Sequence, residues 1–364
     1  MTVRTKRRRT TRTTGREPRR SVRLGWARPA VALGVLAVAV LAGLVVGAAH
    51  IGPGGALATL VDRLPFVHAG TGLTEVQQNV LLQLRLPRVV LAAIVGGLLA
   101  VAGAGYQGVF RNPLADPYLL GAASGAGLGA TVVIVYLPAE RLGGLPILPI
   151  AAFGGALTGV LLAYALGMMA GRASGTANLL LAGVAVTSFL TAVQTYVQQS
   201  SDSTDLSRVY GWILGRLATG GWSDVLLVLP YGAVGAAVLL LHGRALDVLS
   251  VGDDEAESLG MRARRVRLVV IIAASLATAA AVAVSGLIGF VGIVVPHIVR
   301  RLAGGSYRVV LPLSLLGGAA FLVLADILAR TIVAPAELPI GVVTAFVGAP
   351  FFVLVLRMSR GVQT

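Results

Sequence analysis

The feature that most limits the fold of this chain is a series of long windows without any charged residue. Because an α-helix needs about 20 apolar residues to cross a bilayer, most of these windows are long enough to cross once. Only 12% of the residues are charged, about half of the roughly 25% that soluble proteins carry. The sequence therefore predicts an all-α polytopic membrane protein. The windows without Asp, Glu, Lys or Arg are residues 29–61, 89–110, 117–139, 142–171, 173–201, 225–243, 268–299, 309–325 and 338–356.

These windows predict about ten transmembrane helices. The window 268–299 is too long for one helix, so we divide it where glycines loosen its middle, and Pro296 interrupts the second part. An amphipathic stretch at 73–84 and an apolar piece at 209–217 are not expected to span. The expected spans are 29–49, 89–110, 119–136, 148–169, 178–198, 225–241, 267–284, 292–302, 309–327 and 340–356.

The positive charge is concentrated at the N-terminus. Residues 1–28 contain eleven Lys and Arg against one Glu, a net charge of +10. We interpret them as a disordered cytoplasmic tail that obeys the positive-inside rule, followed by a transmembrane domain at 29–364. A nucleic-acid-binding arm is a weaker interpretation of this segment, because an apolar run follows it directly. A cleaved signal peptide is also a weaker interpretation, because that apolar run is too long for one. Ten crossings then put both termini in the cytoplasm.

Composition excludes several kinds of site. Lys6 is the only lysine, so the chain has no Walker A motif, which requires a lysine after its glycines. Cysteine is absent and the four histidines show no metal-ligand spacing. We therefore expect no catalytic residue, cofactor or metal site. If ATP drives this protein, another subunit binds it.

Two patterns indicate how the helices are arranged. The segments 183–189 (Gly-Val-Ala-Val-Thr-Ser-Phe) and 341–346 (Gly-Val-Val-Thr-Ala-Phe) resemble each other. Each lies in the fourth helix of a set of four that begin on opposite sides, as in an inverted-topology repeat. Small residues at a spacing of four, as in 121–125 and 155–159, are typical of closely packed membrane helices.

An acidic segment separates the sixth and seventh expected helices. Four acids lie within residues 253–257, as the start of an exposed helix favours. Asp254 and Glu257 have the spacing of a capping box, Ala256 and Leu259 are expected to form a small apolar edge, and Gly260 is placed as a C-terminal stop. We predict a short cytoplasmic helix that docks on a partner. The alternative is a solvated acidic loop.

Together with this segment, three further motifs resemble the iron-siderophore, haem and cobalamin permease family of ABC importers. They are Arg-Leu-Pro-Arg at 85–88, Gln-Gly-Val-Phe-Arg-Asn-Pro-Leu-Ala-Asp-Pro at 107–117 and Ala-Glu-Leu-Pro-Ile-Gly-Val-Val-Thr at 336–344. The resemblance covers residue 29 to the C-terminus. It implies a multi-pass protein of the bacterial cytoplasmic membrane, with a second permease copy or paralogue, cytoplasmic ATP-binding subunits and an external substrate-binding protein or lipoprotein as partners.

The resemblance also implies roles for individual residues. Arg85, Arg88 and Arg330 match the arginines that dock the binding protein, although two arginines at a helix start could also snorkel to the interface. Gly175 and Thr176 match the cytoplasmic gate, with Gly175 standing where a hydroxyl residue can occur. The segment that matches the ATPase coupling helix is Asp253, Asp254, Glu255, Ala256, Glu257, Ser258, Leu259 and Gly260.

The expected function is that of the transmembrane permease subunit of an ATP-driven importer, without an ATPase site of its own. Ferric siderophores are the expected substrate, because they are the most frequent substrates in the family that the chain resembles. Haem and cobalamin are the alternatives. A proton- or ion-coupled secondary transporter is the competing hypothesis. It needs intramembrane acids, and only Asp326 qualifies. Asp326 and Arg330 lie four residues apart, so they can instead pair on one helix face.

Overall fold

The computed structural model describes residues 27–47, 51–63, 70, 72–137, 141–142, 145–169, 175–217 and 221–360. Nearly all of the predicted basic tail lies outside these residues. The described part is helical apart from one pair of two-residue strands, β1 (Arg141–Leu142) and β2 (Leu145–Pro146). The helices are α1 (Ala27–Val45), α2 (Pro53–Asp62), α3 (Glu75–Asn79), the π-helix η1 (Val80–Arg85), α4 (Leu86–Phe110), α5 (Ala122–Tyr136), α6 (Ile147–Met169), α7 (Gly175–Gln199), α8 (Ser203–Ile213), α9 (Trp222–Leu241), α10 (Gly243–Leu249), α11 (Asp253–Ser258), α12 (Ala263–Ser285), α13 (Val291–Ala303), α14 (Tyr307–Thr331) and α15 (Ile340–Arg360).

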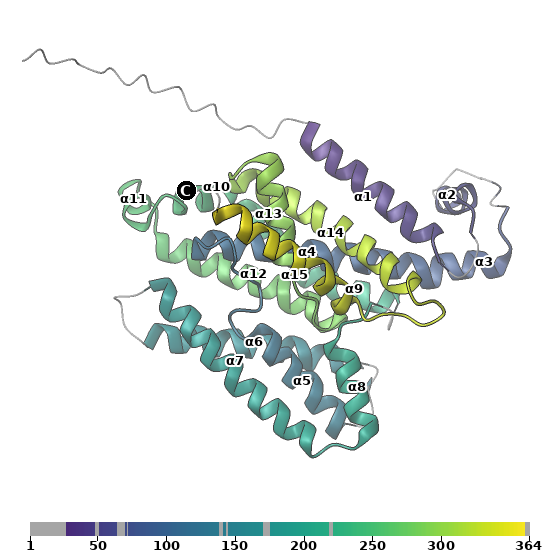
Figure 1. Cartoon of the computed structure of the whole chain (residues 1–364), viewed down its shortest axis with the longest axis horizontal. Helices are drawn as coiled ribbons and strands as arrows, with labels where there is room; N and C mark the ends of the chain where they lie inside the picture. Colours follow the sequence, from purple (N-terminus) through teal and green to yellow (C-terminus); the bar gives the residue numbers. More distant parts are fainter. Residues whose placement is uncertain are drawn as a thin grey trace, which may run out of the picture.

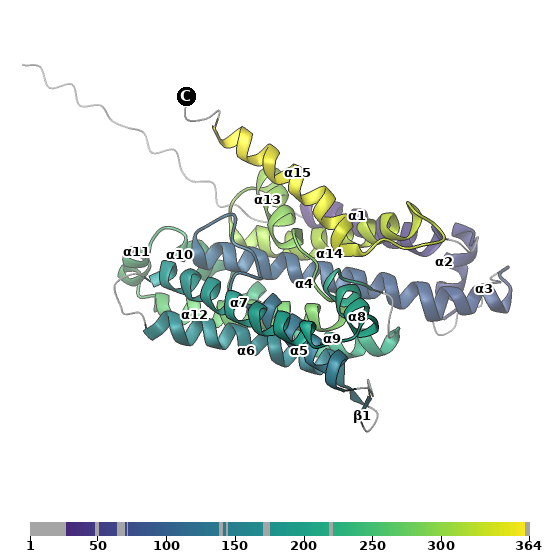
Figure 2. The same ribbon diagram turned by 60° about the horizontal axis from the view of Figure 1, so that its bottom comes forward.

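The helices surround α4, which packs against α9, α12, α13 and α14 (Figure 1). A second group, α5, α6 and α7, lies along one side and contacts the first group mainly through α12. Figure 2 shows α10 and α11 at one end of the molecule and α2 and α3 at the other. The two ends of the molecule therefore differ, with α10 and α11 at one and α2 and α3 at the other.

Seven helices in the described part are long and apolar enough to cross a membrane. They are α1, the continuous helix 75–110, α6, α7, α9, α12 and α14; α5 and α15 contain shorter apolar stretches. The prediction of an all-α polytopic membrane protein is confirmed. Each of the ten expected spans corresponds to one helix, while the number of crossings stays a prediction.

One boundary differs clearly from the expectation. The stretch 73–84 is not a separate amphipathic piece, because α3, η1 and α4 form one continuous helix of 36 residues. Pro87 has no N–H to donate, and the chain widens into the π-turn just before it. The Nε1–H of Trp222 on α9 donates to the carbonyl oxygen of Leu82 at 3.1 Å. A neighbouring helix thus satisfies a carbonyl that the proline leaves open.

Small residues bring helix backbones into direct contact. A Cβ added to Gly125 on α5 would overlap the carbonyl oxygen of Gly155 on α6, and one added to Gly96 on α4 would overlap that of Gly318 on α14. Such approach is how helices associate where lipid supplies no hydrophobic drive. The small-residue packing predicted for 121–125 and 155–159 is confirmed.

The window 268–299 is divided as predicted, between Ser285 and Val291. The break meets the α4–α5 connection, where the hydroxyl of Tyr118 donates to the carbonyl oxygen of Ile288 at 3.0 Å and accepts from its N–H at 3.1 Å. Gln107 Nε2 donates to the carbonyl oxygen of Gly292 at 2.9 Å. Irregular backbone inside a membrane protein is tolerated where protein groups satisfy it. The 107–117 motif therefore has a structural role.

Candidate functional site

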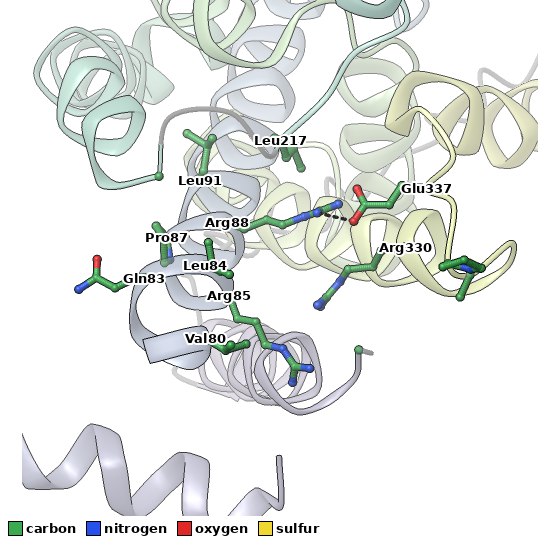
Figure 3. Close-up of a pocket in the computed structure, with 14 residues that line it drawn as sticks. Val80, Gln83, Leu84, Arg85, Pro87, Arg88, Leu91, Leu217, Arg330 and Glu337 are labelled. Carbon is green, nitrogen blue, oxygen red and sulfur yellow. Dashed lines mark hydrogen bonds and ion pairs between the residues drawn. The ribbon is translucent and has the colours of Figure 1, made fainter. Parts of the chain in front are cut away.

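One candidate site lies at the end of the molecule that carries α2 and α3. Arg88 on α4 donates from Nε to Asp326 Oδ1 at 2.9 Å and from Nη1 to Glu337 Oε1 at 2.9 Å. Arg330, one turn after Asp326 on α14, places its Nε 3.3 Å from Asp326 Oδ2. Figure 3 shows Arg88 reaching across to Glu337 with Arg330 nearby. The predicted pairing of Asp326 with Arg330 is confirmed, and Arg88 joins it.

Two of the three predicted docking arginines hold the end of α1. Arg85 is 6% exposed, and its Nη1 donates to the carbonyl oxygens of Leu44 and Val45 at 2.8 and 2.9 Å. Arg330 Nη2 donates to the carbonyl oxygen of Gly43. The last carbonyls of a helix have no partner in the helix, and cations are favourable beside them. Arg85 and Arg330 therefore cap α1, a role that sequence reasoning missed.

A cavity of about 480 Å³ opens beside these side chains (Figure 3). It is lined by residues of the 75–110 helix, the end of α14 and the connection to α15, including Arg85, Arg88, Arg330 and Glu337. The Glu337 side chain is 49% exposed and that of Arg88 is 14% exposed. Arg88 is thus much less exposed than its partner Glu337.

The buried acid has two cationic partners. Asp326 is 1% exposed and lies between Arg88 and Arg330. Its Oδ1 lies 2.8 Å from Arg88 Nη2 and its Oδ2 lies 3.3 Å from Arg330 Nε. These two contacts favour a structural role for Asp326. Within the described ranges, no group of three or more His, Cys, Asp or Glu side chains is placed to hold a metal ion.

A second candidate site lies at the opposite end, where α11 spans Asp253–Ser258. Gly260 has φ of 79°, its N–H donates to the carbonyl oxygen of Glu257 at 2.9 Å, and the N–H of Met261 donates to that of Ala256 at 3.0 Å. These two bonds form a Schellman motif, in which a left-handed glycine ends the helix. The C-terminal stop predicted at Gly260 is present.

Two details of the α11 prediction are wrong. Gly252, not Asp254, is the N-cap residue, and no side chain caps the helix, so the predicted capping box does not form. Ala256 is fully buried while Leu259 is 74% exposed, so the two do not share an outer edge. Val251 is the exposed apolar residue that accompanies Leu259, at 67%. The helix begins two residues earlier than the box requires.

Asp253 connects α11 to two long helices. Arg267 at the start of α12 donates from Nη2 to both carboxylate oxygens of Asp253, at 2.9 and 2.8 Å. Arg111, the residue that ends α4, places its Nη2 3.4 Å from Asp253 Oδ1. Arg111 has φ of 49°, so the chain turns sharply there. We call Arg111, Asp253 and Arg267 the α11 tie.

Sequence reasoning placed Asp253 in α11 but missed both arginines of the tie. Arg267 was assigned no role, and Arg111 was noted only as part of the 107–117 motif. The predicted gate residues, Gly175 and Thr176, are the first of α7. Residues 170–174 before them lie outside the described residues, so the gate stays a prediction.

Comparison with known proteins gives consistent results. A model of the FecCD transport family matches residues 35–358. An uncharacterised ABC transporter permease, YvrB of Bacillus subtilis, is 42% identical over 90% of this chain and 92% of its own length. The cobalamin import permease BtuC of Halobacterium salinarum is 42% identical over 79% of this chain and 75% of its own.

Other relatives are named as permeases for Fe(3+)-citrate, hemin and iron(3+)-hydroxamate. A solved structure of a metal-chelate type ABC transporter in an inward-facing conformation superposes with a TM-score of 0.77. That structure is 30% identical and covers 90% of this chain and 99% of its own.

Proposed function

Because the chain belongs to the FecCD transport family, we propose that it moves a ferric siderophore from an external binding protein to the cytoplasm. The protein is the permease subunit of an ABC importer, a multi-pass membrane protein. The family match over residues 35–358 carries this conclusion. Chelated iron is named for several relatives, and hemin and cobalamin for others, so ferric siderophore is the leading substrate and the other two are its alternatives.

The energy source lies in a partner subunit in this proposal. The chain has one lysine, Lys6, and therefore no Walker A motif. An ATP-binding subunit would dock at α11, against the exposed Val251 and Leu259. Residues 253–260 then act as the coupling segment. The α11 tie would pass nucleotide-driven movement to α4 and α12, with both termini and this face in the cytoplasm.

The binding protein docks at the opposite end in this proposal. Arg88 is the docking residue that the geometry supports best, because it lines the outer cavity and its partner Glu337 is half exposed. A carboxylate of the binding protein would take the position of the Glu337 carboxylate. Arg85 and Arg330 support this end through α1, since their guanidinium groups hold its last carbonyls.

Reconstitution tests the proposed function. The permease, its candidate ATP-binding subunit and its binding protein are placed in vesicles, and uptake of a ferric hydroxamate is measured with and without ATP. Ferric citrate, hemin and cobalamin are the comparison substrates. We expect uptake of a ferric chelate that requires ATP and the binding protein. Uptake that persists without ATP and collapses with a protonophore would instead establish a secondary transporter.

Glu337 offers a sharper test of docking than reversing the arginine charges. Arg88→Glu would place a third carboxylate beside Asp326 and Glu337, so its effect on the fold would obscure docking. If Glu337 competes with a carboxylate of the binding protein for Arg88, then Glu337→Gln should strengthen association at low salt and Arg88→Gln should weaken it. Equal association for both variants and the wild type contradicts the docking role.

A further inference from the structure

The helix α1 is attached to the rest of the molecule along only part of its length. Only 17% of its apolar window is buried, the lowest share among the seven membrane-length helices in the described part. Ala39, Gly43 and Leu44, in the half that ends at Val45, are buried. Val31 and Val35, in the half that begins at Ala27, are 67% and 52% exposed. The first half of α1 therefore packs on its neighbours through one side only, with Ala32 and Leu36 partly buried against the core.

A groove runs between this half of α1 and the pair α13 and α14, and we call it the α1 groove. It has a volume of about 520 Å³, and among the described residues that line it Arg28 is the only polar one. A second apolar hollow of about 410 Å³ continues it along α1 as far as Ala39. The two hollows share Val31, Val35 and Leu324. Together they form one elongated apolar surface with a charged end.

The length of this groove matches one leaflet of a bilayer. From Arg28 to Ala39 the axis of α1 rises about 16 Å at 1.5 Å per residue. Half of a hydrocarbon core of about 30 Å is about 15 Å. The groove therefore runs from the membrane interface at Arg28 to the middle of the bilayer. An extended acyl chain of the leaflet on the Arg28 side has the same direction and length.

The charged end of the groove suits an anionic headgroup. The Arg28 side chain is fixed at the mouth, where its Nη1 donates to the carbonyl oxygen of Ala303 at 2.9 Å. Its residue is exposed, and a guanidinium group has five N–H donors, more than this single bond uses. The sequence 1–28 carries a net charge of +10 directly before the groove. Clustered cations beside a membrane-inserted helix attract anionic lipids.

We propose that the α1 groove is a binding site for one anionic phospholipid. An acyl chain lies between α1 and the pair α13 and α14, and the phosphate lies beside Arg28. The lipid fills the space that separates the first half of α1 from the remainder of the molecule. The groove shares no lining residue with the cavity beside Arg88.

Retention of lipid by the full-length chain tests the proposal. The chain is purified in detergent and incubated with equal amounts of phosphatidylglycerol and phosphatidylcholine. Native mass spectrometry then measures which lipid stays bound and in what number. We expect one retained phospholipid, with phosphatidylglycerol preferred about fivefold, as one interfacial arginine provides. Val35→Trp should fill the groove and abolish retention. Leu33→Trp, at an equally exposed position of α1 that does not line the groove, should retain the lipid.

Two further variants keep the test decisive if Val35→Trp misfolds. Leu324→Trp fills the groove from the α14 side, and Leu328→Trp is its control, because the two positions are 45% and 44% exposed and only Leu324 lines the groove. Arg28→Gln should keep a lipid but lose the preference for phosphatidylglycerol. Glycerophosphoglycerol, which has the headgroup and no acyl chains, should not compete.

Three results would overturn the proposal. The first is equal lipid retention by the groove-filling variants and their controls. The second is competition by the headgroup alone, which would indicate a simple phosphate site. The third is crosslinking of a polypeptide, without any lipid adduct, to a photoreactive residue at position 31 in native membranes.

Discussion

Individual charges in the cluster of Arg88, Asp326, Arg330 and Glu337 differ strongly in their surroundings. Asp326 is 1% exposed and has two guanidinium partners, while the Glu337 side chain is 49% exposed and has one. The spacing of four residues predicted the contact of Asp326 with Arg330. No local pattern could predict its contact with Arg88, because 238 residues separate them. Local spacing thus predicted the Asp326–Arg330 contact but not the contact of Asp326 with Arg88.

The difference in burial predicts different costs for removing single charges. Arg88→Gln should lower the free energy of unfolding by about 3 kcal/mol, the low end of the range for breaking a buried ion pair, since Arg330 remains beside Asp326. Glu337→Gln should change it by less than about 1 kcal/mol, as for exposed pairs. Denaturant unfolding in detergent measures both. Similar costs for the two variants would contradict the assignment of Arg88 to the buried pair.

Gly260 permits a clean test of backbone conformation. Its φ is 79°, and no heavy atom lies within 4 Å of a Cβ built there, so a substitution meets only backbone strain. Gly260→Val should destabilise the end of α11 by about 1–2 kcal/mol and reduce substrate-stimulated ATP hydrolysis in the reconstituted importer. Gly260→Asn is the control, because asparagine tolerates the left-handed region. If both variants hydrolyse ATP like the wild type, the end of α11 does not contribute to coupling.

At the scale of elements, charge-free windows were sufficient to predict ten helices, most of them within a few residues. The exception is the helix that was expected to begin at 89 and begins at 75. That expected start was set by the charge-free window, which begins after Arg88. Proline at position 87 also removes a backbone hydrogen-bond donor. The helix continues because a π-turn and the indole of Trp222 supply what the proline removes. A contact between residues 140 positions apart decided this boundary, and such contacts cannot be derived from local sequence.

The α11 tie predicts how coupling depends on α4. Arg111→Gln removes the ion pair between α4 and α11 but leaves both bonds from Arg267 to Asp253. We expect α11 to stay folded and the binding-protein stimulation of ATP hydrolysis to fall, because the ATPase would then move α11 without moving α4. Stimulated and basal hydrolysis in vesicles measure this ratio.

Arg265→Gln is the matched control for Arg111→Gln. Arg265 is an exposed arginine close to Arg267 and forms no ion pair among the described residues. Its replacement should leave the ratio unchanged. An equal decrease in both variants would indicate a general effect of positive charge on this face.

At the scale of the whole molecule, two connections repeat the same backbone feature. A left-handed residue precedes both α5 and α13: Gly121 with φ of 81° and Phe290 with φ of 69°. These are the second helices of the two four-helix sets in which the sequence predicted an inverted repeat. The shared feature supports that prediction. The similarity of 183–189 and 341–346 suggested the repeat. The left-handed conformation of Phe290 could not be predicted from the sequence, because residues other than glycine rarely adopt it.

Ten crossings predict which short connections face each side of the membrane. The natural sequence has no cysteine, so each single-cysteine variant has one reactive thiol. Ser203→Cys, at the first residue of α8, should react with an impermeant maleimide added outside intact cells. Ser258→Cys in α11 should react only after the membrane is opened. The same accessibility for both positions would contradict ten crossings.

The anchoring of α1 has a consequence for the order of events during synthesis. Its last carbonyls are held by Arg85 and by Arg330, and 287 residues separate Arg330 from Gly43. At about 5–20 residues per second, the ribosome needs roughly 15 to 60 s to produce this interval. For that time α1 is already in the bilayer without its second anchor. Only 17% of its apolar window is buried in the folded protein, so α1 depends little on these later contacts to stay in the bilayer, although its second anchor is made long after it.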